Sequence, residues 1–298
     1  KQSMNGCAKK RFENYKQQPL ELVFDKSFTG KLSQFGLNPD RRTPSGIKAA
    51  IIREKGTNGE REMAYMLYLA GFDVKDVTMT DLVSGRETLE NINMVVYCGG
   101  FSNSDVLGSA KGWAGTFLFN PKAKAALDNF YARQDTLSLG VCNGCQLMME
   151  LGLITPEDKK QGKMLHNDSH KFESAFLGVT VPMNRSVMFG SLSGSKLGIW
   201  VAHGEGKFSL PYPEDHYNVV LKYSYDEYPG NPNGSDYSIA GIASQDGRHL
   251  AMMPHLERAC FPWENAYYPA DRVKEDQITP WMEAFVNARK WVEAHMQK

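Results

Sequence analysis

The fold is decided by the stretch Leu137-Ser138-Leu139-Gly140-Val141-Cys142-Asn143-Gly144-Cys145-Gln146. Its first five residues form a short apolar run that predicts a buried strand, and residues 145–151 read as a helix. Cys142 therefore lies at a strand-to-helix turn, flanked by glycines that allow the chain to turn sharply against a neighbouring strand. The free N–H groups at the start of the helix favour a thiolate over a thiol. This pattern predicts that Cys142 is a covalent catalyst.

Regular strand and helix patterns extend on both sides of this turn. Apolar runs predict strands at residues 48–53, 72–77, 93–98 and 137–141, and helical spacing predicts helices at 60–70 and 121–131. This alternation indicates an α/β protein, with a parallel sheet covered by helices on both faces.

The second half of the chain changes character. Strands are predicted at residues 172–181, 197–201, 219–225, 239–243 and 249–253, and a closing helix at 281–295. Gly-, Pro- and Asn-rich turns join these strands. We expect them to form an antiparallel extension of the same sheet.

A thiolate nucleophile needs a proton acceptor, and the acceptor needs an orienting group. His255 and Glu257 follow the predicted strand at 249–253, and strand ends are where open α/β sheets place their sites. Because side chains alternate in an extended segment, both residues should project to one side. Glu257 can then hold one imidazole nitrogen while the other faces Cys142.

Acyl transfer also needs donors for an oxyanion. The turn at Cys142 offers the backbone N–H of Asn143, and the glycine-rich turn Gly99-Gly100-Phe101-Ser102 should lie at the same end of the sheet. The turn at 99–102 is equally compatible with a plain strand-to-helix connection.

Two other chemistries are compatible with parts of the sequence. Cys142 and Cys145 have the spacing of a thiol–disulfide exchange pair, but a redox module leaves His255 and Glu257 without a role. His166 and His170 have the i, i+4 spacing of helical metal ligands, yet their polar surroundings favour a loop and no third ligand is evident. We therefore predict no metal site.

Composition narrows the class of partner. The 298 residues carry 34 Lys and Arg against 34 Asp and Glu, which argues against nucleic acid or a membrane surface as a partner held by charge. No apolar run is long enough for a transmembrane helix, and no dinucleotide or Walker motif occurs. The five cysteines do not form a disulfide framework, so we expect a cytoplasmic location.

Taken together, the segments at 140–146, 99–102 and 254–258 resemble the class I (triad) glutamine amidotransferases. Longer segments at 55–62, 77–82, 100–113, 202–206 and 231–235 resemble one branch of that class, the C-terminal glutaminase domains of the large phosphoribosylformylglycinamidine synthases. The resemblance covers residue 47 to the end of the sequence. It implies a flavodoxin-like, mostly parallel open sheet with an antiparallel extension.

The resemblance also assigns roles. Cys142, His255 and Glu257 would hydrolyse the glutamine side-chain amide, and an ATP-dependent synthetase would use the ammonia to convert formylglycinamide ribonucleotide to formylglycinamidine ribonucleotide. The oxyanion would lie near Gly100, Phe101 and Asn143. The expected substrate contacts are Gln146, Ser102, His203, Gly204 and Glu205. A non-catalytic docking domain is the alternative that a complete Cys, His and Glu set disfavours.

The remaining expectations concern the rest of the natural chain. Residues 1–46 resemble the end of the synthetase region and its linker, and residues 47–298 the glutaminase domain. We expect no cofactor in residues 1–298, with ATP and Mg²⁺ confined to the synthetase region outside them, and that synthetase region as the partner. Leu256 replaces a proline common in the family and should point away from the cysteine.

Overall fold

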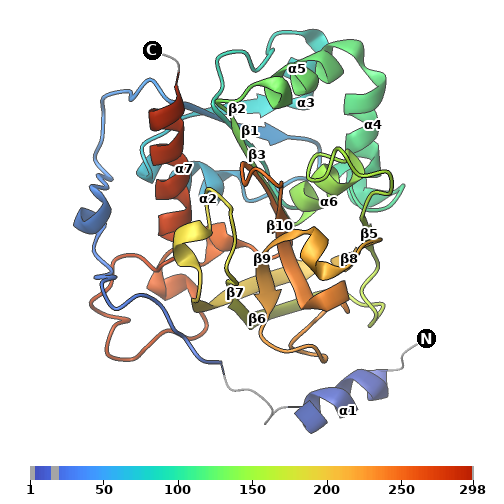
Figure 1. The fold of residues 1–298 in the computed structure, drawn as a ribbon, viewed down its shortest axis with the longest axis vertical. Helices are drawn as coiled ribbons and strands as arrows, with labels where there is room; N and C mark the ends of the chain where they lie inside the picture. The colour runs from blue at the N-terminus through green and yellow to red at the C-terminus, as the bar shows by residue number, and fades with distance from the viewer. Residues whose placement is uncertain (1–3, 15–19, 297–298) are drawn as a thin grey trace.

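The structure, a computed structural model, describes residues 4–14 and 20–296. Within these ranges the chain forms a nine-stranded sheet and a separate two-stranded ribbon (Figure 1). The strand order of the large sheet is β2-β1-β3-β4-β11-β10-β9-β6-β7. Its strands are β1 (Lys48–Arg53), β2 (Asp73–Thr78), β3 (Met94–Tyr97), β4 (Leu137–Val141), β6 (Glu173–Thr180), β7 (Lys196–His203), β9 (Asn218–Tyr223), β10 (Ile239–Ala243) and β11 (His249–Met252). The ribbon pairs β5 (Lys163–Leu165) with β8 (Lys207–Ser209).

Five neighbouring strands, β2, β1, β3, β4 and β11, run parallel to one another. The strands predicted from apolar runs are confirmed here, and β3 and β4 are buried along their whole length. A strand covered on both faces has no solvent side, so its sequence is continuously apolar rather than alternating. The order 2-1-3-4 followed by a fifth parallel strand is that of flavodoxin-like sheets.

The expected antiparallel extension is confirmed for β10, β9, β6 and β7. It is wrong for β11, which pairs in parallel with β4 and antiparallel with β10. Strand direction could not be derived from the apolar run alone, since such a run is the same in either direction. As a result, β4 and β11 end at the same edge of the sheet.

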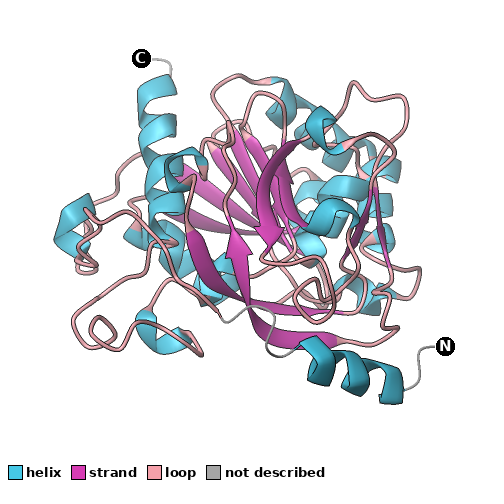
Figure 2. Ribbon diagram, turned by 60° about the horizontal axis from the view of Figure 1, so that its bottom comes forward, coloured by secondary structure: helices cyan, strands magenta, loops and turns pink. Residues whose placement is uncertain are grey.

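Helices cover both faces of the sheet, as Figure 2 shows. On one face lie α2 (Glu60–Leu69) and α7 (Met282–His295), which contact each other. On the other lie α3 (Met79–Ser84), α4 (Lys111–Phe119), α5 (Pro121–Ala132) and α6 (Asn143–Glu150). The predicted helix ends are confirmed for α2, where Gly71 follows the last turn with φ +103°, and for α5, where Pro121 opens the helix.

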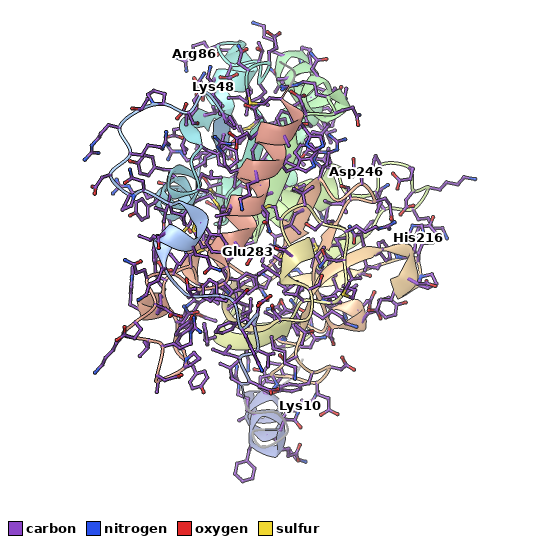
Figure 3. The ribbon with its side chains drawn as sticks, turned by 60° about the vertical axis from the view of Figure 1, so that its left-hand side comes forward. Lys10, Lys48, Arg86, His216, Asp246 and Glu283 are labelled. Carbon is purple, nitrogen blue, oxygen red and sulfur yellow. The ribbon has the colours of Figure 1, made fainter. Side chains whose placement is uncertain are left out.

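The N-terminal segment contains α1 (Met4–Asn14), which lies at the opposite end of the molecule from the start of β1 (Lys10 and Lys48 in Figure 3). Arg11 of α1 donates a hydrogen bond to Glu173 of β6 at 3.0 Å. Residues 20–46 are mostly irregular but pack on the body, since Val23 pairs with Lys196 of β7. The predicted division after residue 46 stays a prediction, and its residues 1–3 and 15–19 lie outside the described ranges.

Candidate active site

Cys142 occupies the sharp turn between β4 and α6. Its backbone has φ +53° and ψ −107°, a conformation that residues with a side chain rarely adopt. A Cβ built at Gly140 would lie 2.5 Å from the Gly144 carbonyl oxygen, and one built at Gly144 would lie 2.0 Å from the Tyr97 carbonyl oxygen. Only glycine fits at these two positions, which explains the flanking residues seen in the sequence.

The parallel pairing of β4 with β11 brings the two halves of the site together. Cys142 N–H donates to the Met252 carbonyl oxygen at 2.9 Å, and His255 follows three residues after Met252. His255 N–H in turn donates to the carbonyl oxygen of Trp200 on β7 at 2.9 Å. Two strands therefore hold the histidine beside the cysteine.

Glu257 orients His255, although by a different backbone route from the predicted one. The expected extended segment is wrong, because residues Leu256–Arg258 form a 3-10 turn. The turn nevertheless places Glu257 Oε1 2.7 Å from His255 Nδ1. Both side chains are buried, and Nε2 of the ring is left for the hydrogen-bonding interaction between His255 and the Cys142 side chain.

The site favours a protonated His255. Burial lowers the pKa of this imidazole, but the negative charge of Glu257 and the neighbouring Cys142 outweigh it and raise the pKa to about 10. Glu257 Oε2 has no hydrogen-bond partner within the described residues, so the Glu257 charge is directed mainly at the ring.

The predicted oxyanion residues converge on the turn that follows β3. A Cβ built at Gly99 would lie 2.8 Å from His255 Cε1 and 3.2 Å from Cys142 Cβ, so this turn touches both residues. Among the described residues, no backbone acceptor is found for Asn143 N–H or Gly100 N–H. Phe101 N–H differs, because it donates to the Gly56 carbonyl oxygen at 2.9 Å. The structure thus leaves two of the three predicted donors available.

A cavity of about 520 Å³ opens above Cys142. Four of the five expected substrate contacts line it together with Cys142: Gln146, His203, Gly204 and Glu205. Phe101 also lines it, although its N–H is engaged by the Gly56 carbonyl oxygen. Ser102 is buried behind the wall of the cavity, and its N–H donates to Asn143 Oδ1 at 3.0 Å.

Gln146 connects the turn at Cys142 to the opposite wall of the cavity. Its Oε1 accepts a hydrogen bond from Asn143 Nδ2 at 2.8 Å, and its Nε2 donates to the Glu205 carbonyl oxygen at 2.7 Å. Glu205 itself is held through Oε2, which accepts from Ser109 N–H at 2.7 Å. These bonds fix the cavity wall, so the expected substrate contacts lie on a constrained surface.

His203 is a buried neutral histidine at the end of β7. Burial, followed by the charge of nearby His255, lowers its pKa to about 4. Its Nδ1 has no partner among the described residues, and its Nε2 lies 3.5 Å from Asn233 Nδ2. Nδ1 is buried and lies on the side of Gly206, since a Cβ built at that glycine would lie 2.6 Å from it.

Asp105 lines the same cavity, although the sequence patterns did not predict it as a site residue. Burial raises the pKa of its carboxyl, while hydrogen bonds from Ala110 N–H and Asn143 Nδ2 partly offset this effect. No cation pairs with this carboxylate within the described residues. Asn103, Ser104 and Asp105 all have φ near +50°, a conformation that no local pattern indicates. The other lining residues that were not predicted are Ser104, His166, His170, Lys171, Phe172 and Ala202.

The other chemistries considered have a weaker basis in the structure. Cys145 is fully buried in α6, and burial raises the pKa of its thiol well above the usual range, so it is poorly suited to thiol exchange. His166 and His170 lie in an exposed loop at the cavity mouth, as the polar composition predicted. Within residues 4–14 and 20–296, no three potential ligands gather as a metal site would require.

Comparison with known proteins places the chain in a family. It belongs to the CobB/CobQ-like glutamine amidotransferase domains, whose family model matches residues 46–292. Among individual proteins, it is 45% identical over 266 residues to a probable phosphoribosylformylglycinamidine synthase of Arabidopsis thaliana, named chloroplastic/mitochondrial. It is 44% identical over 280 residues to the phosphoribosylformylglycinamidine synthase of Homo sapiens. These alignments cover 83% and 84% of this chain but only 19% and 21% of those proteins, so the chain spans about a fifth of their length.

Solved structures agree with this assignment. A PurLQS structure from Thermotoga maritima matches with a TM-score of 0.60 and 25% sequence identity, covering 84% of this chain and 99% of that one. A glutamine amidotransferase from the same organism matches with a TM-score of 0.50 at 17% identity, covering 83% of this chain and 99% of that one, which shows a shared fold. The sheet is therefore that of the class I glutamine amidotransferases, as predicted.

Proposed function

We propose that Cys142 hydrolyses the side-chain amide of glutamine through a thioester. The observation that carries this proposal is the buried set of Cys142, His255 and Glu257 at the edge where β4 and β11 end. A nucleophile, a base and an orienting carboxylate in this order are the components of covalent acyl transfer.

In the proposed reaction, Cys142 Sγ attacks the amide carbon, and Gly100 N–H and Asn143 N–H stabilise the resulting oxyanion. His255 donates its Nε2 proton to the amide nitrogen as the C–N bond breaks, and ammonia leaves. Water then attacks the thioester carbon and gives its proton to His255. The C–S bond breaks, releasing glutamate and restoring the thiolate beside the imidazolium.

The cavity walls suit an amino acid substrate. Asp105 and Glu205 supply carboxylates for the α-ammonium group, and Gln146, His203 and Gly204 supply polar groups nearby. Asp105 lacks a cation of its own, and a ligand ammonium would offset the unfavourable burial of its charge. Glutamine fits these features, and no metal or cofactor is needed for the amide hydrolysis.

We further propose that the ammonia serves a synthetase region of the natural protein, which would use ATP and Mg²⁺ to make formylglycinamidine ribonucleotide in purine biosynthesis. The names and greater length of the relatives support this step. A cytoplasmic location is part of the proposal, since Cys98, Cys142, Cys145 and Cys260 form no disulfide within the described residues. Within the described ranges, no helix has the length and apolar character needed to cross a membrane.

Labelling with 6-diazo-5-oxonorleucine tests the proposed hydrolysis. We expect one covalent adduct on Cys142, and loss of both labelling and glutamate release in Cys142→Ala. Cys145→Ser is the matched control and should retain most activity, whereas a redox module would lose it. An adduct on Cys145, or glutamate release that survives in Cys142→Ala, would overturn the proposal.

The synthetase step needs a separate test in the full-length protein. Cys142→Ala should abolish formation of formylglycinamidine ribonucleotide from glutamine but leave formation from ammonium chloride unchanged. If neither nitrogen source yields the product in the wild-type protein, the synthetase assignment fails and the glutaminase assignment stands.

A further inference from the structure

We infer that Arg258 is a positioning residue. It links the carboxylate of Glu257 to the loop of residues 54–59. That loop in turn holds residues 99–103, the turn that carries Gly100 N–H and is called the oxyanion turn below. This inference rests on the proposed function. Arg258 directly follows Glu257 and touches neither the cavity nor the nucleophile in the described structure. Its effect on the reaction would therefore be exerted through other residues.

The Arg258 guanidinium contacts two elements at once. Its Nη2 donates to Asn58 Oδ1 at 2.9 Å, in the loop of residues 54–59. Its Nε lies 3.5 Å from Glu62 Oε1 on α2 and 3.9 Å from Glu257 Oε1. Because the guanidinium is planar and rigid, these contacts constrain Asn58 and Glu257 relative to each other.

The 54–59 loop in turn holds the oxyanion turn through its backbone. Asn58 N–H donates to the Gly99 carbonyl oxygen at 2.9 Å, at the start of this turn. The Gly56 and Lys55 carbonyl oxygens accept from two N–H groups further along it, at 2.9 Å and 2.7 Å. A Cβ built at Gly100 would lie 2.6 Å from the Gly56 carbonyl oxygen. The two loops are thus packed backbone against backbone, so a shift of one moves the other.

The oxyanion turn lies directly against the catalytic pair. The atoms nearest to a Cβ built at Gly99 are His255 Cε1 and Cys142 Cβ, as described above. The contacts therefore form a closed chain from Glu257 through Arg258, the 54–59 loop and Gly99 to His255. Each link is a hydrogen bond, an ion pair within 4.0 Å or a packed glycine, and both His255 and the turn that carries Gly100 N–H lie on it.

Charge supports the same role. Glu257 is buried, and within the described residues His255 and Arg258 are the cations within 4.0 Å of its carboxylate. Nearby Glu264 shows how negative this region is, because burial and the charges of Glu257 and Glu62 raise its pKa to about 7. Without Arg258, Glu257 would face these carboxylates with no cation on that side.

Steady-state glutaminase kinetics of variants of the full-length protein test this role. Arg258→Met keeps the length of the side chain and removes the guanidinium, and Asn58→Leu removes its acceptor. We expect each to lower kcat about 10- to 100-fold while KM for glutamine changes less than about twofold. The double variant should be no slower than the slower single variant, because both changes break one contact. Asn58→Asp keeps the acceptor and should retain activity.

The matched control is Arg272→Met. Arg272 is similarly exposed, at 27% of its side chain against 32% for Arg258, and it pairs with Asp276 away from the cavity. It should keep kcat even if it lowers the melting temperature. Millimolar methylguanidine should restore part of the activity of Arg258→Ala and none of the activity of Cys142→Ala. A merely structural role of Arg258 would not give this rescue.

Three outcomes would overturn the inference. They are a wild-type kcat in Arg258→Met, effects of the Arg258 and Asn58 changes that simply multiply, or a change in KM alone. If Arg258→Met does not fold, Asn58→Leu decides the question in the same assay. A wild-type protein that releases no glutamate and forms no Cys142 adduct would instead overturn the proposed function.

Discussion

Cys142 has a backbone conformation that costs an ordinary residue about 1–3 kcal/mol. Surrounding contacts impose it, since Met252 accepts its N–H and Gly144 packs on Tyr97. This conformation keeps the sulfur at the base of the cavity, beside the Ala202 carbonyl oxygen at 3.6 Å. The strained backbone thus lies at the residue on whose position the proposed chemistry depends.

The charge on Glu257 should determine the alkaline limit of the reaction. His255, with a pKa raised to about 10 from 6.5, remains an imidazolium until the pH approaches 10. Glu257→Gln removes the largest contribution that raises this pKa, so the alkaline limb of kcat/KM should move to lower pH. Glu214→Gln, at a surface ion pair with Lys222, should leave the profile unchanged. An unshifted limb in Glu257→Gln would contradict this assignment.

The same titration should appear in stability. A histidine whose pKa is higher in the folded state stabilises the fold fully below about pH 6.5, and this stabilisation is lost as the pH rises through about 10. Chemical unfolding between pH 6.5 and 10 should therefore show a decline that is smaller in Glu257→Gln. Equal slopes for the two proteins would show that His255 does not carry the expected charge.

Asp105 should govern glutamine affinity rather than the chemical step. Asp105→Asn removes the charge that we assign to the α-ammonium group, and a hydrogen bond to a charged group is worth about 1.5–3 kcal/mol. We expect KM for glutamine to rise about tenfold or more with kcat within about threefold. Asp128→Asn, on the exposed side of α5, is the control. A fall in kcat alone would place Asp105 in another role.

At the scale of elements, the sharp turn between β4 and α6 depends on space rather than on side-chain contacts. Gly140 and Gly144 allow α6 to lie directly against β3 and β4. This close packing lets the first N–H groups of the helix point toward the cavity, where the reacting oxygen would lie. A methyl group at either position would separate helix and sheet.

Gly144→Ala should therefore damage both fold and site. The added carbon would lie 2.0 Å from the Tyr97 carbonyl oxygen, a distance that requires backbone movement. We expect a loss of about 2 kcal/mol or more in unfolding free energy, and at least tenfold slower labelling of Cys142 in whatever folded protein remains. Gly190→Ala, where the nearest atom is 3.9 Å away, should change neither quantity measurably. Equal behaviour of the two variants would contradict this interpretation.

The elements show which parts of the structure are predictable. Buried parallel strands and the cysteine turn were recognisable because apolar runs and paired glycines are local signals. The direction of β11 was not, because it depends on which neighbour the strand finds. Asp105 was missed for a related reason. Its position depends on three consecutive left-handed residues that are stabilised by contacts with distant segments.

At the scale of the whole molecule, residues 20–46 pack with the body despite their irregular backbone. Phe28 is buried among Phe24, Phe35 and the side chain of Arg272. Lys31 and Leu32 contact the segment near Gln277, and Val23 pairs with β7. Residues 20–46 thus contribute buried surface, although the sequence predicted the tail of a synthetase region and a linker there.

Phe28→Ala tests whether this segment stabilises the body. Removing a buried phenylalanine side chain typically costs about 3–5 kcal/mol. We expect a loss of that size in the unfolding free energy, with Phe119→Ala, exposed by 87%, close to wild type. A loss below about 1 kcal/mol would mean that residues 20–46 are dispensable to the folded body.

The central position of β11 has a consequence for how the molecule forms. This strand joins the parallel half of the sheet to the antiparallel half, yet it is the last of the nine strands to be synthesised. Until residue 252 is available, β4 and β10 have no neighbour between them, and His255, the proposed base, is still missing. The pairing of β11 with β4 joins strands that are far apart in the sequence, and such pairings form late and slowly. Under the proposed mechanism, the nascent chain therefore cannot hydrolyse amides through this thiol until the sheet closes.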